Sequence, residues 1–306
     1  MPFTLPPIPI LHVGGPEPIG GWYTHWLLDP RIAAYLFVIT GLYLAWTGPL
    51  NRRRPGFENR PVKRSEIRWF LTGSVMALIA LGPPIDDWSY YFFLSAHMLQ
   101  HLLLMFVVVP CWIKGIPAWV YRPLIENPKR FAVAKTMVNP VVAYLGSSLI
   151  VIVWHVPVLY NGALEHELLH MIQHQCFILA GFWIWWPMMS KVPELGPLPP
   201  PLQCVYLFLQ TLPGGIVGAF ITYAENILYP HYGQSMQRPW GIDLKTDQEI
   251  GGLSMWVGTN VLFLLLISII FLNWASKEEA KDRNAALARQ RERNRIVATG
   301  GTPPGP

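Results

Sequence analysis

Two stretches of the sequence carry histidine at the spacing of a helical turn. Residues 96–101 read AHMLQH and residues 165–175 read EHELLHMIQHQ. Residues four apart on a helix lie on one face, so each stretch presents a row of imidazoles, and imidazole binds copper, zinc, iron and nickel. A further histidine stands in VWHVP, at 153–157. We therefore predict a metal site whose ligands are His97, His101, His170 and His174, with His155 as a fifth candidate.

The elements that hold these histidines are predicted to be membrane-spanning helices. Of the 306 residues, 52% are hydrophobic and 13% are charged, whereas soluble domains have about a quarter charged residues. A helix needs about 20 largely apolar residues to cross the roughly 30 Å of hydrocarbon in a bilayer. Seven windows meet this requirement, at about 31–49, 66–83, 91–113, 139–156, 166–187, 202–222 and 250–274. We expect an all-α, polytopic membrane helix bundle with about seven transmembrane helices.

The distribution of Lys and Arg predicts the orientation of this bundle. Basic residues are concentrated between the first and second windows, between the third and fourth, and after the last. Because positive charge accumulates on the cytoplasmic side, the N-terminus is predicted to lie outside and the C-terminus in the cytoplasm. The expected divisions are an extracytoplasmic segment (1–30), a membrane domain (31–274) and a basic cytoplasmic tail (275–306). The net charge of +5 is thus a topology signal and does not indicate nucleic-acid binding.

With this orientation the histidine rows gather in the outer leaflet. The third and fifth windows enter from outside and the fourth ends there, so both rows and His155 share one end of the bundle. A single intramembrane histidine often makes a hydrogen bond between helices, but ionisable residues at membrane depth generally mark functional sites. His166 is expected at the mouth of the site, and His231 is expected to be an ordinary exposed residue. Neighbouring residues keep open roles, as thioether ligands or packing residues and as groups that orient the ligands: Met98, Met105, Met171, Asp86, Asp87 and Glu167.

Other features narrow the classes of protein. The three cysteines, Cys111, Cys176 and Cys204, form no CxxC pair, so neither a thiol relay nor a disulfide framework is expected. The first residues lack the basic start and long apolar core of a cleavable signal peptide. Gly214 and Gly218 form a small-xxx-small pair, which predicts a close helix contact in the sixth window.

Three other functions fit part of this pattern. Two histidines on facing helices can ligate a b-type haem. A copper or proton transporter would need polar groups that continue to the inner side, for which Gln210 and Thr211 are the only indication. Residues 166–170 read HELLH, which matches the HExxH of zinc-dependent hydrolases, where two histidines bind zinc and the glutamate acts as a base.

Five segments occur in the order typical of one protein family. They are SAHMLQHLLLM (95–105), WHVP (154–157), LYNGAL (159–164), HELLHMIQH (166–174) and FWIWWPMM (182–189). In these segments the chain resembles the CtaG family, the multi-span bacterial cytochrome c oxidase assembly factors. His97, His101, His155, His170 and His174 are the positions that match the family.

The resemblance implies a non-enzymatic role in forming a haem-copper oxidase. It implies a multi-pass protein of the bacterial cytoplasmic (inner) membrane that delivers or inserts copper, with oxidase subunit I or II as its partner. Copper is accordingly the expected ion, although ligand types alone also allow zinc, and haem remains an alternative. The missing CxxC or CxxxC pair argues against a cysteine-based copper relay.

Overall fold

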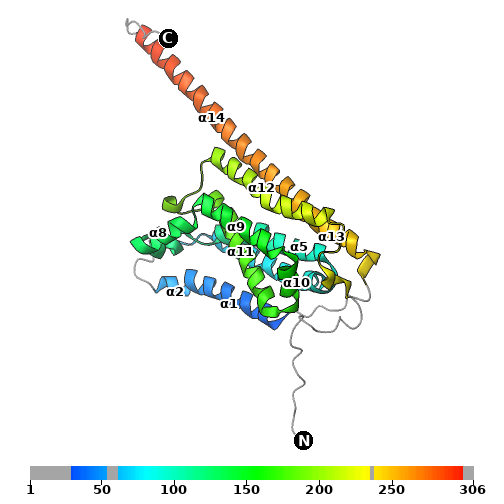
Figure 1. The fold of residues 1–306 in the computed structure, drawn as a ribbon. Helices are drawn as coiled ribbons and strands as arrows, with labels where there is room; N and C mark the ends of the chain where they lie inside the picture. The colour runs from blue at the N-terminus through cyan, green and yellow to red at the C-terminus, as the bar shows by residue number, and fades with distance from the viewer. Residues whose placement is uncertain (1–28, 54–60, 235–237, 299–306) are drawn as a thin grey trace.

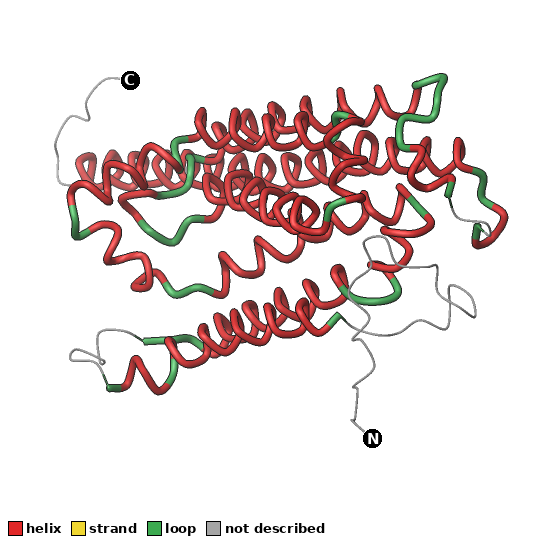
Figure 2. The backbone as a smooth tube through the Cα atoms, turned by 60° about the horizontal axis from the view of Figure 1, so that its bottom comes forward, coloured by secondary structure: helices red, strands yellow, loops and turns green. Residues whose placement is uncertain are grey.

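The computed structural model describes residues 29–53, 61–234 and 238–298, and every regular element within these ranges is a helix (Figure 2). The helices are α1 (Pro30–Thr47), α2 (Pro49–Arg52), α3 (Arg64–Leu81), α4 (Ile85–Asp87), α5 (Leu94–Leu103), α6 (Val109–Gly115), α7 (Arg122–Ile125), α8 (Pro128–Met137), α9 (Pro140–Trp154), α10 (Pro157–Glu165), α11 (Glu167–Met189), α12 (Pro200–Tyr223), α13 (Leu244–Leu253) and α14 (Thr259–Ala298). The predicted all-α class is confirmed for this part of the chain.

Shorter helical turns join or extend these helices. Three are π-helical, namely η2 (Trp88–Phe92), η3 (Leu104–Val108) and η8 (Ser254–Gly258), and four are 3₁₀ turns, namely η4 (Ala118–Tyr121), η5 (Pro193–Leu195), η6 (Pro230–Gly233) and η7 (Pro239–Gly241). Through η3, α5 and α6 form one helix from Leu94 to Gly115, and through η8, α13 and α14 form another from Leu244 to Ile296.

Proline and side-chain caps define several helix ends. Pro140 stands in the first turn of α9, where its missing N–H is not needed. The Asn139 side chain accepts a hydrogen bond from the backbone N–H of Val141 at the same end. Helix α9 ends at Trp154, three residues before Pro157 opens α10. The WHVP segment therefore turns the chain and leaves His155 at the C-terminal cap of α9.

Four helices are long and apolar enough to cross a membrane, and the number rises to six if each of two bent pairs is one span. The four are Pro30–Arg52, Leu94–Gly115, Pro200–Tyr223 and Leu244–Ile296, and the pairs are Arg64–Leu81 with Ile85–Phe92 and Pro128–Met137 with Pro140–Trp154. Helix α11 has 23 residues, but its first half contains two histidines and two glutamines, which lower its hydropathy. The count of seven spans and the orientation of the termini stay predictions.

Much of the bundle surface is apolar. Ile216 on α12 is 70% exposed and Leu272 on α14 is 63% exposed, and both belong to long rows of exposed aliphatic residues. Contiguous apolar surface of this kind is rare on soluble monomers. In Figure 1, α14 (orange to red) lies beside α12 and then continues well beyond the other helices. Lipid is the environment that suits such a surface.

Glycines allow α12 and α13 to approach closely. A Cβ atom at Gly218 would lie 2.7 Å from the carbonyl oxygen of Gly252, so neither position has room for a side chain. At Gly214 the nearest atom to such a Cβ is the carbonyl oxygen of Met255 at 3.8 Å, an ordinary contact. The predicted close contact therefore exists at Gly218, and its partner is Gly252 instead of a residue facing Gly214.

The predicted domain limits fall partly outside the described residues and partly inside a helix. Residues 1–28 of the predicted N-terminal segment and residues 299–306 of the tail lie outside the described residues. The limit at residue 274 falls inside α14, which continues without a break to Ala298. It marks a change from apolar to charged composition within one helix, and the division into domains stays a prediction.

Candidate metal centre

Helices α5 and α11 bring the two histidine rows face to face. His97 and His101, one turn apart on α5, are 0% and 2% exposed. His170 and His174, one turn apart on α11, are partly buried. The His97 ring lies 5.2 Å from the His170 ring and the His101 ring lies 5.5 Å from the His174 ring, between centroids. The spacing of four in both helices thus produces a cluster of four imidazoles.

Three of these imidazoles have the separation that metal chelation requires. One ring nitrogen from each of His97, His101 and His174 lies within 4.8 Å of the others. The Nε2 atoms of His97 and His101 are 3.0 Å apart. Two ligands at 2.0–2.1 Å from a tetrahedral ion lie about 3.3 Å apart. The pair on α5 is therefore close to chelating geometry, and by the same comparison His174 needs a shift of at most about 1.5 Å.

His170 and His155 flank this trio on two sides. The His170 ring lies 4.4 Å from the His174 ring, and the His155 ring lies 6.4 Å from the His101 ring, between centroids. The ring of Phe177 stacks on His101 at 4.0 Å and lies 5.7 Å from the His155 ring, between centroids. All five predicted histidines therefore lie together at one end of the bundle. Three of them, His97, His101 and His174, form the centre of this cluster.

Hydrogen bonds at Nδ1 allow two of the imidazoles to present Nε2 to a metal. The Tyr232 hydroxyl oxygen lies 3.1 Å from the carbonyl oxygen of Ser89 and 2.9 Å from His97 Nδ1. When its proton goes to Ser89, the hydroxyl accepts a hydrogen bond from His97 Nδ1. His155 Nδ1 lies 2.6 Å from the carbonyl oxygen of Val151 and must donate to it. In this arrangement Nε2 carries the lone pair in both rings. Metal-bound histidines characteristically donate their second nitrogen to an oxygen in this way.

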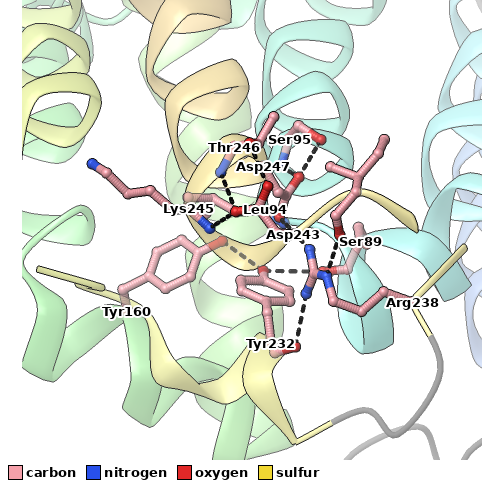
Figure 3. A network of polar contacts seen from close by, with 11 residues as sticks. Ser89, Leu94, Ser95, Tyr160, Tyr232, Arg238, Asp243, Lys245, Thr246 and Asp247 are labelled. Atoms are coloured by element: carbon pink, nitrogen blue, oxygen red, sulfur yellow. Dashed lines mark hydrogen bonds and ion pairs between the residues drawn. The ribbon is translucent and has the colours of Figure 1, made fainter. Parts of the chain in front are cut away.

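A polar network ties Tyr232 to the helix that carries His97 (Figure 3). Asp247 of α13 is fully buried and accepts hydrogen bonds from the Leu94 and Ser95 backbone N–H groups at 2.7 and 3.2 Å, which caps the start of α5. Arg238 lies 3.3 Å from Asp247 and donates to the carbonyl oxygen of Tyr232 at 2.9 Å. The cap of α5 and the position of Tyr232 thus depend on one ion pair.

Several buried polar atoms around the cluster lack a partner among the described residues. They are Nδ1 of His101, Nε2 of His155, Nε2 of His174 and both amide atoms of Gln173. Buried polar groups are nearly always hydrogen-bonded, so such atoms call for a ligand, an ion or water. The Nε2 atoms of His155 and His174 are imidazole nitrogens that can bind a transition metal ion, whereas His101 lies against His97 through its Nε2 atom. The donor set therefore fits copper and equally fits zinc.

A small internal cavity continues from the cluster toward the middle of the bundle. Its volume is about 40 Å³, and its lining includes His101, His155 and the thioethers of Met98, Met105 and Met255. Met171, in contrast, is exposed on α11 and is not in this lining. The cavity has room for an ion or for water, whereas a porphyrin is far larger. The geometry thus favours a single ion over the b-type haem.

The HExxH letters do not form a site. His166 precedes α11 with extended backbone angles and is exposed, so it does not share a helical face with His170. Glu167 forms an ion pair with Arg31 of α1. The motif requires both histidines on one helix around a common ion, and this arrangement does not provide it.

Two carboxylates near the cluster, whose roles the sequence leaves open, lie inside the protein. Asp86 and Asp87 are buried. Asp86 Oδ1 accepts a hydrogen bond at 3.0 Å from Gln100, which lies on α5 one residue before His101. Asp86 therefore holds Gln100, the neighbour of His101, in place.

Tyrosines near the cluster were missed by reasoning from the sequence. Tyr160 and Tyr232 are fully buried, and their hydroxyl oxygens are 2.8 Å apart. Tyr160 lies in the LYNGAL segment, which the family resemblance had already singled out.

His231 is also partly buried, against the Tyr90 carbonyl oxygen at 3.2 Å. Its burial lowers its pKa, and that hydrogen bond offsets the effect only in part. The expectation that His231 is an ordinary exposed residue is therefore wrong.

Comparison with known proteins gives a family and distant relatives. Residues 41–277 match the model of the cytochrome c oxidase caa3 assembly factor family (Caa3_CtaG). The chain is 24% identical over 292 residues to the uncharacterized protein ML1998 of Mycobacterium leprae, and 24% identical over 290 residues to the uncharacterized protein Mb0105 of Mycobacterium bovis. Each alignment covers 88% of this chain but 43% of the relative, so the chain spans less than half of their length. No solved structure matches.

The match includes every histidine of the cluster and most of the bundle around it. It begins within α1 and ends within α14, and it contains α5, α9 and α11 completely. The chain therefore belongs to the family of cytochrome c oxidase caa3 assembly factors.

Proposed function

We propose that this chain binds a copper ion between α5 and α11 and aids its insertion into a haem-copper cytochrome c oxidase. The observation that carries the proposal is the buried trio His97, His101 and His174, whose ligand nitrogens lie within 4.8 Å of one another. His170 and His155 are the further ligands that the ion reaches after small shifts of their rings.

The surroundings favour copper over zinc as the cargo. Thioethers select Cu(I), and Met98, Met105 and Met255 line the cavity that continues from His101. Zinc prefers a closed tetrahedral set or carboxylate partners, and the nearby carboxylate of Asp86 accepts from Gln100. The soft cavity beside the imidazoles therefore suits a copper ion that must be released again.

The acceptor is a copper centre of the oxidase, in subunit I or in subunit II. The family supports an association with the oxidase. The positive-inside distribution of Lys and Arg supports a multi-pass protein of the bacterial inner membrane, with the cluster in its outer half. The role is that of a carrier and requires no chemical step at the ion.

Copper content of the purified protein tests the proposal. Wild type and His101→Ala are loaded with copper, desalted and measured by metal analysis, with His166→Ala as the control because His166 is exposed outside the cluster. We expect about one ion per chain in wild type and control, and a loss of at least tenfold in His101→Ala. Near-zero copper in all three after loading would sink the copper site.

A second readout separates metal binding from the family role. In a strain that lacks this protein, oxidase activity is measured after complementation with wild type, His101→Ala or His166→Ala. We expect rescue by wild type and His166→Ala alone. Full rescue by a folded His101→Ala that binds no copper would leave assembly intact and refute copper as its means.

A further inference from the structure

A large cavity lies at the opposite end of the bundle from the histidine cluster. It is bounded by the start of α3, the end of α6 and the segments that follow α6 and α11. Its volume is about 780 Å³, within the range of about 300–1,000 Å³ typical of ligand sites. His97 and Lys114 are 17 residues apart on one continuous helix, which corresponds to about 26 Å. The cavity is therefore separate from the metal centre.

The lining of this cavity carries an excess of positive charge. Lys63, Lys114 and Arg122 line it, and none of them forms an ion pair within the described residues. Among the described lining residues, Glu194 is the carboxylate without an ion pair that opposes them. Three cations against one anion create a positive potential inside a concave surface, and such a surface attracts anions.

A fixed ion pair forms the wall behind these cations. Lys191 lies 2.8 Å from Glu66, and it also donates to the carbonyl oxygens of Lys114 at 2.6 Å and Ile116 at 3.2 Å. These contacts join α3, the end of α6 and the segment after α11. Lys191 therefore has a structural role, and the three unpaired cations remain available to a ligand.

Tryptophan places the cavity at the depth of lipid headgroups. The Lys114 ammonium lies 4.7 Å from the centre of the Trp69 ring, and Trp69 is 42% exposed. Trp119 also lines the cavity. Tryptophan is enriched where membrane meets water, and the cavity lies where the candidate span Leu94–Gly115 ends. A ligand at this depth is reached more readily from the bilayer than from bulk water.

We propose that this cavity binds the phosphate-bearing headgroup of an anionic phospholipid. Lys114 and Arg122 contact the phosphate, and the indole rings flank the glycerol region. Basic pockets at the ends of membrane helices recognise such headgroups through the same combination of charge and position. The proposal does not depend on copper binding.

Lipid retention by the full-length protein tests this assignment. The protein is purified in detergent and titrated with phosphatidylglycerol or phosphatidylcholine, and bound lipid is counted by native mass spectrometry. The test variant is Lys114→Gln with Arg122→Gln. The control is Arg289→Gln with Arg291→Gln, which removes two exposed cations of α14. Elution volume and thermal unfolding verify that each variant is folded.

We expect wild type and control to retain phosphatidylglycerol at least tenfold more tightly than phosphatidylcholine. The cavity variant should lose roughly 30-fold in affinity for phosphatidylglycerol, about fivefold for each cation near the anionic group. Equal retention of the two lipids by wild type, or full retention by the folded cavity variant, would overturn the proposal. A third arm adds glycerol phosphate: displacement of phosphatidylglycerol at equal concentration would assign the cavity to a soluble phosphate ester instead.

Discussion

The hydroxyl of Tyr232 offers a direct test of how the metal centre is built. Tyr232→Phe removes one oxygen and keeps the buried ring. That oxygen accepts from His97 Nδ1 at 2.9 Å, donates to the Ser89 carbonyl oxygen at 3.1 Å and lies 2.8 Å from the Tyr160 hydroxyl. Without it, the His97 ring loses the bond that presents its Nε2 lone pair to the ion. The structure therefore predicts weaker copper binding with all the proposed ligands still present.

The expected loss has two parts. Removing the partner of a metal-bound histidine lowers metal affinity by about 10- to 100-fold, or about 1.4 to 2.7 kcal/mol. The same change leaves the Ser89 carbonyl oxygen and the Tyr160 hydroxyl without this partner, and each unsatisfied buried group costs about 1–3 kcal/mol of stability. A second tyrosine is needed to separate these two effects.

Tyr206→Phe is the matched control. Tyr206 on α12 is buried, donates to the Trp183 carbonyl oxygen at 2.9 Å and accepts from Gln210 Nε2 at 2.9 Å. Tyr206→Phe therefore removes a hydroxyl that makes the same kinds of hydrogen bond as that of Tyr232, but none of them is to a histidine. We expect both variants to unfold at lower temperature than wild type, and Tyr232→Phe alone to bind copper more weakly.

Competition with a copper chelator of known affinity measures the difference. The proteins are held in the same detergent, and the chelator's absorbance reports the copper it retains. A Tyr232→Phe affinity within twofold of wild type would refute the reasoning that this hydroxyl orients His97. Equal losses in both tyrosine variants would show that general loosening of the bundle, and not the tautomer of one ring, controls the site.

Three further changes test other parts of the structure. Glu167→Gln removes the ion pair with Arg31, which is partly exposed; we expect less than about 1 kcal/mol of lost stability and unchanged copper content, and loss of function with copper retained would instead revive a hydrolytic role. Asp247→Asn breaks the buried ion pair with Arg238 and weakens the cap of α5. Thermal unfolding should show about 3–5 kcal/mol of lost stability. An unchanged melting temperature would contradict the structural role given to this ion pair. Burial lowers the pKa of His231 below its ordinary value of about 6.5. As the pH falls, the unfolded chain therefore takes up the proton first, and the stability of the folded protein should fall below about pH 6.5. His231→Gln should reduce this loss of stability, measured by thermal unfolding at pH 7.5 and pH 5.5.

Helical periodicity explains why the histidine cluster was predictable. His97 and His101 share one helical face, as do His170 and His174, and both helices start at the same end of the bundle. Two rows that enter side by side must meet if their helices pack together. The local pattern therefore sufficed to predict which imidazoles gather, although their role toward a metal stays a prediction.

The groups that orient the cluster could not be predicted in the same way. Tyr232 contacts His97 across 135 residues of sequence, from a short turn with no periodic pattern. Asp247 caps α5 across 153 residues. Such contacts depend on how the segment between α12 and α13 folds back over the bundle, and hydropathy carries no information about this. The number of membrane spans is hard to predict for a related reason. The histidines and glutamines of α11 lower its mean hydropathy, which is the quantity used to detect a span.

The depth of the histidine cluster bears on the rate at which an ion is exchanged. His97 and Tyr232 are completely enclosed, and the chain around Tyr232 covers the end of α5 through Arg238 and Asp247. An ion bound there as proposed would be shielded on the side of His97, which is fully enclosed, and reached more easily on the side of His174, which is partly buried. In the proposed carrier, this enclosure would slow the loss of the ion to competing chelators. The thermodynamic affinity of the site can therefore be moderate while the bound ion is kinetically protected.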